Sequence, residues 1–532
     1  MPLQLHFLGG ATTVTGSHYL LETDHGRVVI DCGMFQGTPD VRVRNQVPLA
    51  YDPSTVDAML LTHAHLDHCG LIPRVVKAGF AGPIYATGGT IELAALVLLD
   101  AGRLQQEFAK REMRWERRHP ELALEDDRRE LAEYQAAVDL AAAGKVLRDS
   151  PALAPPGGLH TGEHVATTIE PAEPVAWQMP DPSLDLDAPL YTERDARAAL
   201  THFRAIAYDE ETEVAPGVHA RFVDAGHILG SAIIVLRVAA SGSTAERTLV
   251  FSGDLGRSGS PILRDYTAVS EADYVLVETT YGGREHQPEA EAVRVLAETV
   301  RLVAESDGVL LVPSFAIGRT QDIVYQLDRL IESGSIPLLP LYLDSPMGSK
   351  ATDIYRRHVE YYDDEAARLQ RSGDTPLDYP NQIVTNDVAD SEKIAHAPRP
   401  YMIVASNGML TGGRVIGHLH ELIGDPAATI LFVGYQGVGT LGASLQAGAR
   451  SVKMDGHLVE VRCQVRSISG FSAHADEPQL LAWLRNFATG RAPRRVFLVH
   501  GDADAQTAIE PRIQALGLPT TIPRWRERIT LD

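Results

Sequence analysis

Short apolar runs alternate with polar turns over the first hundred residues. Two of these runs, Val28-Val29-Ile30 and Met59-Leu60-Leu61, are typical, and each ends in a polar segment. Runs of this length with β-branched residues, bounded by turn residues, indicate buried strands. The chain therefore begins with strand-rich structure.

The pattern changes to helical spacing between Leu104 and Val146. This stretch is rich in Glu, Arg, Ala and Leu and is interrupted near His119-Pro120, so it predicts a charged helical hairpin. Pro, Ala, Gly and Asp then dominate from 151 to about 189, which predicts an irregular excursion. The strand pattern resumes near Val218.

A strand–loop–helix rhythm follows Asp254. The apolar strands begin at Val309, Leu341 and Tyr401, and each is followed by a loop and a helix. This repetition predicts a parallel sheet with covering helices. We therefore expect a first unit over residues 1–284 with an insertion at about 105–190, an α/β unit over 285–440, and a return to the first unit over 441–532.

Composition and charge constrain where the chain works. It has 532 residues, three cysteines and a formal net charge of −22. No apolar run is long enough for a membrane span, and no cleavable leader precedes the first strand. Sparse cysteines indicate a reducing compartment, so we expect a cytoplasmic protein. The acidic charge is unusual for a nucleic-acid binder, which normally carries a basic surface.

The densest polar signal is the segment His63-Ala64-His65-Leu66-Asp67-His68. Three imidazoles and a carboxylate in six residues are costly to bury unless each finds a partner, and a metal ion supplies one. His63 and His65 point the same way from an extended segment, whereas Asp67 and His68 turn toward a neighbouring position. One segment can thus serve two metal ions.

Three further carboxylates or imidazoles follow apolar strands at Gly-rich turns. They are His227 in Asp224–Ser231, Asp254 in Phe251–Gly256, and Asp31 before Gly33. Alone, the His227 and Asp254 segments are equally consistent with ordinary turns, and the Asp31 segment is a weaker signal still, since Asp before a Gly turn is common.

Together, these motifs resemble the ordered series of the metallo-β-lactamase-fold hydrolases. Three later segments, around Glu278 (Val277–Gly282), His474 (Phe471–Asp476) and His500 (Leu498–Gly501), resemble the additional motifs of the β-CASP nucleases within that superfamily. This family includes the RNA-cutting subunit of the cleavage and polyadenylation machinery. The resemblance covers residues 1–100 and 200–532 and implies an αβ/βα sandwich with an inserted α/β β-CASP domain. No family motif is found from about 105 to 190.

The resemblance implies a two-metal site. One zinc would be held by His63, His65, His227 and Asp254, and the second by Asp67, His68, His500 and the shared Asp254. Asp31 would orient ligands from behind. Imidazole and carboxylate ligands suit zinc, and the same set would accept manganese. Two such ions, with Asp67 in the catalytic centre, would activate a hydroxide that cuts RNA and leaves a 5′-phosphate and a 3′-hydroxyl.

The same resemblance assigns His474 as general acid and Glu278 as the group that orients it. In this family a histidine at position 500 accompanies RNA cutting, whereas DNA cutters tend to carry valine. Five residues in Gly-rich helix starts of the inserted unit are candidate contacts for single-stranded RNA, although such turns equally serve plain strand-to-helix connections. They are Arg319, Ser406, Gly408, Gly412 and Gly413.

Several alternatives stay open. DNA hydrolysis, thioester or lactam hydrolysis, and an inactive scaffold subunit are rival functions. The inserted unit speaks against a small substrate, and the complete ligand set speaks against a scaffold. His160 and His164 have helical ligand spacing, but their Pro- and Gly-rich surroundings favour a plain loop. The sequence decides neither the RNA target, nor internal against terminal cutting, nor whether the chain forms a homodimer.

Overall fold

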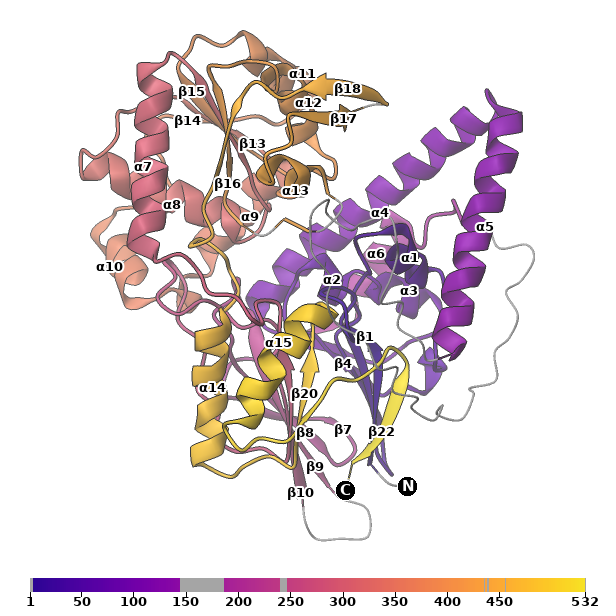
Figure 1. The fold of residues 1–532 in the computed structure, drawn as a ribbon. Helices are drawn as coiled ribbons and strands as arrows, with labels where there is room; N and C mark the ends of the chain where they lie inside the picture. The colour runs from indigo at the N-terminus through magenta and orange to yellow at the C-terminus, as the bar shows by residue number, and fades with distance from the viewer. Residues whose placement is uncertain are drawn as a thin grey trace, which may run out of the picture.

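The computed structural model describes residues 3–143, 186–239, 246–434, 436–437, 440–454 and 456–531. Two large sheets face each other and form a first unit, and a smaller sheet forms a second unit beside them (Figure 1). His160 and His164 lie outside the described residues. Within the described residues, no helix has the length and apolar character that crossing a membrane requires.

The first unit contains two seven-stranded sheets. In spatial order, one is β22 (Glu527–Leu531), β1 (Leu3–Gly9), β2 (His18–Glu22), β3 (Arg27–Ile30), β4 (Ala58–Leu60), β5 (Ile84–Ala86) and β6 (Phe203–Ala205). The other is β21 (Thr520–Thr521), β20 (Arg495–Val499), β11 (Tyr274–Glu278), β10 (Glu246–Phe251), β9 (Ala232–Ala239), β8 (Val218–Asp224) and β7 (Glu211–Ala215).

Alternating side chains build the core between these sheets. Leu3, Leu5 and Phe7 of β1 point inward and pack with Phe222 and Phe497 of the facing sheet. Helices cover both outer faces: α3 (Ile72–Lys77), α4 (Gly88–Glu116) and α6 (Glu193–Leu200) on one, α14 (Glu477–Thr489) and α15 (Ala503–Gln514) on the other. The predicted four-layer αβ/βα sandwich is therefore confirmed.

The second unit has a six-stranded sheet whose neighbouring strands are all parallel. Its spatial order is β14 (Gln382–Val384), β13 (Leu341–Asp344), β15 (Tyr401–Ala405), β12 (Val309–Pro313), β16 (Ala428–Phe432) and β19 (Gln464–Ser467). Helices α7 (Glu289–Glu305) and α8 (Arg319–Glu332) cover one face, and α12 (Arg414–Leu422) covers the other. This is the inserted α/β arrangement that the repeated strand–loop–helix pattern predicts.

The last strand of this sheet comes from beyond residue 440, where the sequence suggested a return to the first unit. β19 pairs with β16, and the hairpin of β17 (Ser451–Met454) and β18 (His457–Glu460) precedes it. We therefore propose that the second unit extends to about Ser467. Besides α5 (Pro120–Ala143), the remaining α-helices of the described residues are α1 (Pro39–Arg42), α2 (Leu66–Cys69), α9 (Pro346–Arg357), α10 (Asp364–Ser372), α11 (Val388–Lys393) and α13 (Leu441–Gln446).

The predicted helical hairpin consists of α4 and α5 (Pro120–Ala143), and it breaks before Pro120 as the sequence indicates. Its first helix begins at Gly88, well before the expected start at Leu104. The reason is that Leu93, Val97 and Leu98 give the first half of α4 an apolar face, which packs on the core. Charged residues dominate only where the helix leaves the body.

Candidate metal centre

The predicted ligands meet because they follow strands that end at one edge of the sandwich. β3 runs parallel to β4, and β10, β11 and β20 run parallel to one another. Asp31 follows β3, Asp254 follows β10, and His500 follows β20. Residues far apart in the sequence are thus brought together by the sheet topology.

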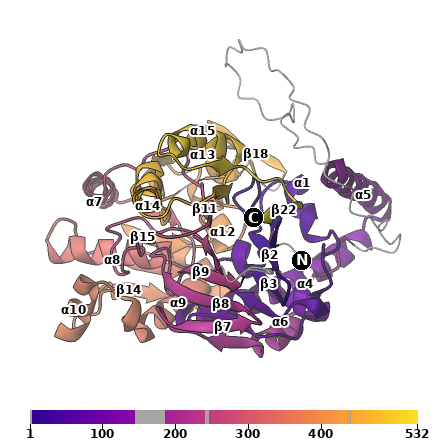
Figure 2. The ribbon, with the colours of Figure 1, turned by 90° about the horizontal axis from the view of Figure 1, so that it is seen from below.

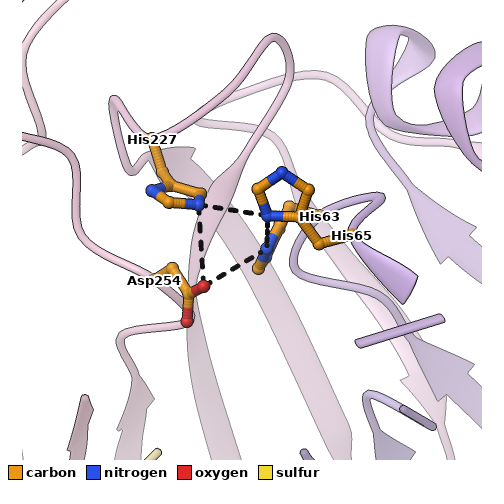
Figure 3. A group of neighbouring side chains, drawn as sticks. All are labelled: His63, His65, His227 and Asp254. Atoms are coloured by element: carbon orange, nitrogen blue, oxygen red, sulfur yellow. Dashed lines mark hydrogen bonds and ion pairs between the residues drawn. The ribbon is translucent and has the colours of Figure 1, made fainter. Parts of the chain in front are cut away.

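The first group of ligand atoms belongs to His63, His65, His227 and Asp254, which point toward one another in Figure 3. His65 Nδ1 lies 3.1 Å from His63 Nε2 and 3.2 Å from His227 Nε2. Asp254 Oδ2 lies 3.4 Å from His63 Nε2 and 3.6 Å from His227 Nε2. All four atoms lie within 4.8 Å of one another, so one metal ion could be held among them.

The second group belongs to Asp67, His68 and His500. His500 Nε2 lies 3.5 Å from Asp67 Oδ2. The other oxygen of Asp254, Oδ1, lies 3.3 Å from His68 Nε2 and 2.8 Å from His500 Nδ1. Asp254 therefore presents one carboxylate oxygen to each group.

Among the described residues, several polar atoms at this centre are buried without a hydrogen bond of normal geometry, although the ligands lie close together. They are His68 Nε2, Asp254 Oδ1 and both ring nitrogens of His500. Buried polar atoms without partners are rare because each carries a desolvation penalty. A cation at each group would satisfy them, so the donor set fits metal ions.

The pKa values of several ligands also agree with metal binding. Burial and the neighbouring imidazoles hold the pKa of His63 and of His227 well below the ordinary value, so each ring keeps a lone pair for a cation. Burial alone would raise the pKa of Asp254, but His500, His68 and His63 together lower it well below its usual range. His63, His227 and Asp254 are thus in the charge states that metal binding requires.

Comparison with known proteins gives the family. Three family models match: the metallo-β-lactamase superfamily over residues 11–170, the Beta-Casp domain over 320–445, and the Zn-dependent metallo-hydrolase RNA specificity domain over 458–523. Ribonuclease TTHA0252 of Thermus thermophilus is 32% identical over 521 residues, which are 98% of each chain. The chain belongs to the β-CASP family of metallo-β-lactamase-fold ribonucleases.

More distant relatives are longer than this β-CASP chain. Transcription termination factor FttA of Methanosarcina mazei is 29% identical over 515 residues, which cover 94% of this chain and 67% of the relative. The factor of the same name from Pyrococcus horikoshii is 27% identical over 553 residues, with 98% and 70% covered. The family models place the chain among metal-dependent hydrolases.

Asp31 lies behind the second group of this β-CASP centre. Its carboxylate accepts hydrogen bonds from Thr62 N, from Thr62 Oγ1 and from His68 Nδ1, each 2.8 Å long. Burial alone would lower the pKa of His68, but the carboxylates of Asp254 and Asp31 raise it well above its ordinary value. A metal ion that binds His68 Nε2 would therefore displace a proton.

Sequence reasoning missed Thr62. Its hydroxyl also lies 3.1 Å from His63 Nδ1, so this one side chain bridges Asp31 and a predicted ligand. A threonine at the end of a strand is too common to stand out. Only the convergence of three hydrogen bonds on it in the structure reveals its place in the centre.

His474 stands beside the first group on a different loop. Its Nδ1 lies 3.2 Å from Glu278 Oε1 and 4.0 Å from Asp254 Oδ2, and its side chain is 22% exposed. Glu278 is fully buried and also accepts from the backbone N–H of Leu255 and Thr280. Burial alone would lower the pKa of His474, but Glu278, Asp254 and Asp67 raise it to about 9.

The candidate RNA contacts lie at the carboxyl edge of the second sheet. Arg319 opens α8 but is buried, and its Nη1 donates to Asp322 Oδ2. Ser406 follows β15 and shares a hydrogen bond with Ser345, while Gly412 and Gly413 precede α12 with positive φ. Within the described part of the chain, no hydrogen bond or ion pair joins these residues to the metal ligands.

The loop that carries His227 nevertheless meets this edge of the second unit. A Cβ at Gly318, just before α8, would lie only 3.0 Å from Ile228 Cγ2. The backbone N–H of Leu229 donates to Tyr355 Oη of α9. The start of α8 is thus packed against the metal centre, although Arg319 itself is engaged with Asp322.

Proposed function

We propose that this protein hydrolyses RNA phosphodiester bonds with two zinc ions and leaves a 5′-phosphate and a 3′-hydroxyl. The observation that carries the proposal is the division of Asp254: Oδ2 faces His63 and His227, and Oδ1 faces His68 and His500. A carboxylate that offers one oxygen to each of two ligand groups suits a two-metal centre.

The ligands of this proposal are those expected from the family resemblance. His63, His65, His227 and Asp254 would hold one ion, and Asp67, His68, His500 and Asp254 the other. When bound, the ions supply a hydroxide at neutral pH and neutralise charge on a phosphoryl oxygen. Manganese would suit the same ligands.

His474 would supply the proton that the reaction needs. Its Nδ1–H donates to Glu278, so Nε2–H is left to protonate the departing 3′-oxygen. As the new oxygen–phosphorus bond forms, the bond from phosphorus to the 3′-oxygen breaks, and this oxygen receives the proton. Glu278 would hold the ring in this orientation and keep it protonated.

RNA is favoured as the substrate by two findings. A family model for RNA specificity matches residues 458–523, which include His474 and His500, and the relative from Thermus thermophilus is named a ribonuclease. The six-stranded second unit against the His227 loop is suited to a polymer rather than a small thioester or lactam. DNA remains the rival substrate.

The test is incubation of the purified protein with end-labelled RNA and DNA of matched sequence, with and without a chelator, alongside measurement of bound metal. We expect chelator-sensitive cleavage of RNA, about two zinc-type ions per chain, and products whose new 5′ ends lose phosphate to a phosphatase. A variant with His63→Ala and Asp254→Ala is the matched inactive control. Cleavage of DNA alone, or RNA cleavage that survives both chelation and these substitutions, would contradict the proposal.

A further inference from the structure

The outer half of α4 carries none of the proposed metal ligands, although the helix begins beside the metal centre. Thr87, its N-cap, donates from Oγ1 to Gly230 O, three residues after His227. α4 then spans 29 residues, and its far end projects from the body together with α5 (Figures 1 and 2). At 1.5 Å per residue, Arg103 lies about 22 Å and Arg117 about 44 Å along the helix from its start.

Basic residues on this outer half gather on one face. Six exposed cations fall within an arc of about 120° around the helix, given 3.6 residues per turn. They are Arg103, Lys110, Arg111, Arg114, Arg117 and Arg118, and we call them the α4 basic stripe. Glu107 alone interrupts it, whereas Glu112 and Glu116 turn to the opposite side and line a small pocket against α5.

The stripe is left largely without counter-charges. Among the described side chains, only Arg103 of the six forms an ion pair, with Asp100. A solvated helix face normally mixes both signs, because like charges three or four residues apart repel. Such segregation in a chain of net charge −22 indicates that the opposing charge comes from another molecule.

The stripe lies on the side of α4 that faces the second unit. Glu92, about three turns before Arg103, is on the same face of the helix and forms ion pairs with Arg357 and His358 at the end of α9. The stripe therefore continues outward from the place where the two units meet. Phe108, 59% exposed, stands at its margin one turn from Arg111 and offers a ring on which a base could stack.

We propose that the α4 basic stripe binds the phosphates of single-stranded RNA beyond the nucleotides held at the metal centre. The inference rests on the proposed ribonuclease function and extends it, because it assigns preference for long RNA to a segment that carries none of the proposed metal ligands. The stripe would supply a basic surface on a chain whose net charge is −22. An RNA strand that leaves the junction of the two units would meet the cations in order.

The test compares two triple variants with the same change in charge. Lys110→Ser, Arg114→Ser and Arg117→Ser remove the middle of the stripe. Arg368→Ser, Arg371→Ser and Arg485→Ser remove three exposed cations from α10 and α14, away from α4. Each protein, loaded with zinc, is titrated with fluorescent RNAs of about 6 and about 30 nucleotides, chosen to fall short of and to exceed the reach of α4.

Each phosphate contact contributes about 0.7 to the slope of log affinity against log salt for single strands. Loss of three contacts should therefore lower the slope for the long RNA by about 2 and weaken its binding by about 100-fold at 0.1 M salt. The ratio of long-RNA to short-RNA affinity should fall accordingly, whereas the α10/α14 variant should keep the wild-type ratio.

Equal slopes and affinities for the two triple variants would overturn the proposal. The stripe would then be interpreted as a binding surface for a protein partner. Failure of the ribonuclease function is distinguishable, because it appears as absence of cleavage by the zinc-loaded wild type. If the slope falls while neither RNA is cut, the stripe binds RNA and the proposed reaction is wrong. Thermal unfolding confirms that the exposed substitutions leave the fold intact, and Lys110→Glu alone provides a second, milder variant.

Discussion

Substitution of Asp31 by asparagine keeps the shape of the side chain but reverses two of its three hydrogen bonds. Thr62 N can only donate, so the amide oxygen must stay on it, and the new NH₂ group must face Thr62 Oγ1 and His68 Nδ1. His68 can accept from this group only if its proton moves to Nε2. That nitrogen is the atom that faces Asp254 Oδ1 and would bind metal.

The size of the effect follows from this geometry. If the proton stays on Nδ1, two donors oppose each other in a buried site, at a cost of about 1–3 kcal/mol. If it moves, the ring must return to the other tautomer before metal binds. Both routes agree with the loss of metal affinity, about 10–100-fold, that is typical when a residue hydrogen-bonded to a metal ligand is replaced. The loss should fall on the Asp67–His68–His500 group first, since His68 contacts Asp31 directly, whereas His63 is linked to it only through the Thr62 hydroxyl.

The assay is titration of metal-free protein with zinc against a competing chelator, which resolves a stronger and a weaker site. Asp344→Asn is the matched control, because Asp344 is also buried and accepts from a threonine, Thr385, and a histidine, His418, but in the second unit. It should lower thermal stability without changing zinc affinity. If Asp31→Asn binds both ions within twofold of the wild type, Asp31 does not set the tautomer of His68.

Three further predictions concern the same centre. His474→Ala should slow RNA cleavage by about 10²–10⁴-fold, because a general acid is lost, while bound zinc measured by mass spectrometry stays the same; loss of an ion would make His474 a ligand. Glu278→Gln should move the basic limb of the pH–rate profile to lower pH. The limb moves to lower pH because a proton donor is active only below its pKa, and Glu278 is the largest of the influences that raise the pKa of His474 to about 9. If the limb does not move, another group donates the proton. Asp254→Ala should remove both ions, whereas His63→Ala should mainly weaken one, and equal losses in the two variants would contradict the shared position of Asp254.

Much of the fold was accessible from the sequence because the pattern is local. Apolar runs such as Val309–Val312 directly predict buried parallel strands. The segment from His63 to His68 carries four candidate ligands in six residues. The start of α4 was misjudged because its buried first half lacks the charged composition that marks the rest. The place of β19 was not evident, since strand order depends on contacts between distant segments.

The candidate metal centre was likewise only partly predictable from the sequence. Asp31, His227 and Asp254 each looked like ordinary turn residues, and only the facing arrangement of the two sheets, whose strands end at one edge of the sandwich, brings them together. Thr62 and the α4 basic stripe had no motif at all. Their arrangement depends on hydrogen-bond geometry and on which side of a helix meets the body, and neither can be read from composition.

The topology of the ligands also determines when the centre can exist during protein synthesis. His63 and His68 emerge early, but His500 follows β20, which can pair with β11 only after the whole second unit has been made. A nascent chain on the ribosome therefore holds the first histidines without the one that completes the Asp67 group. An enzyme that cuts RNA would thus stay inert while it is still attached to its own messenger, and it would gain activity only as the last strands of the sandwich close.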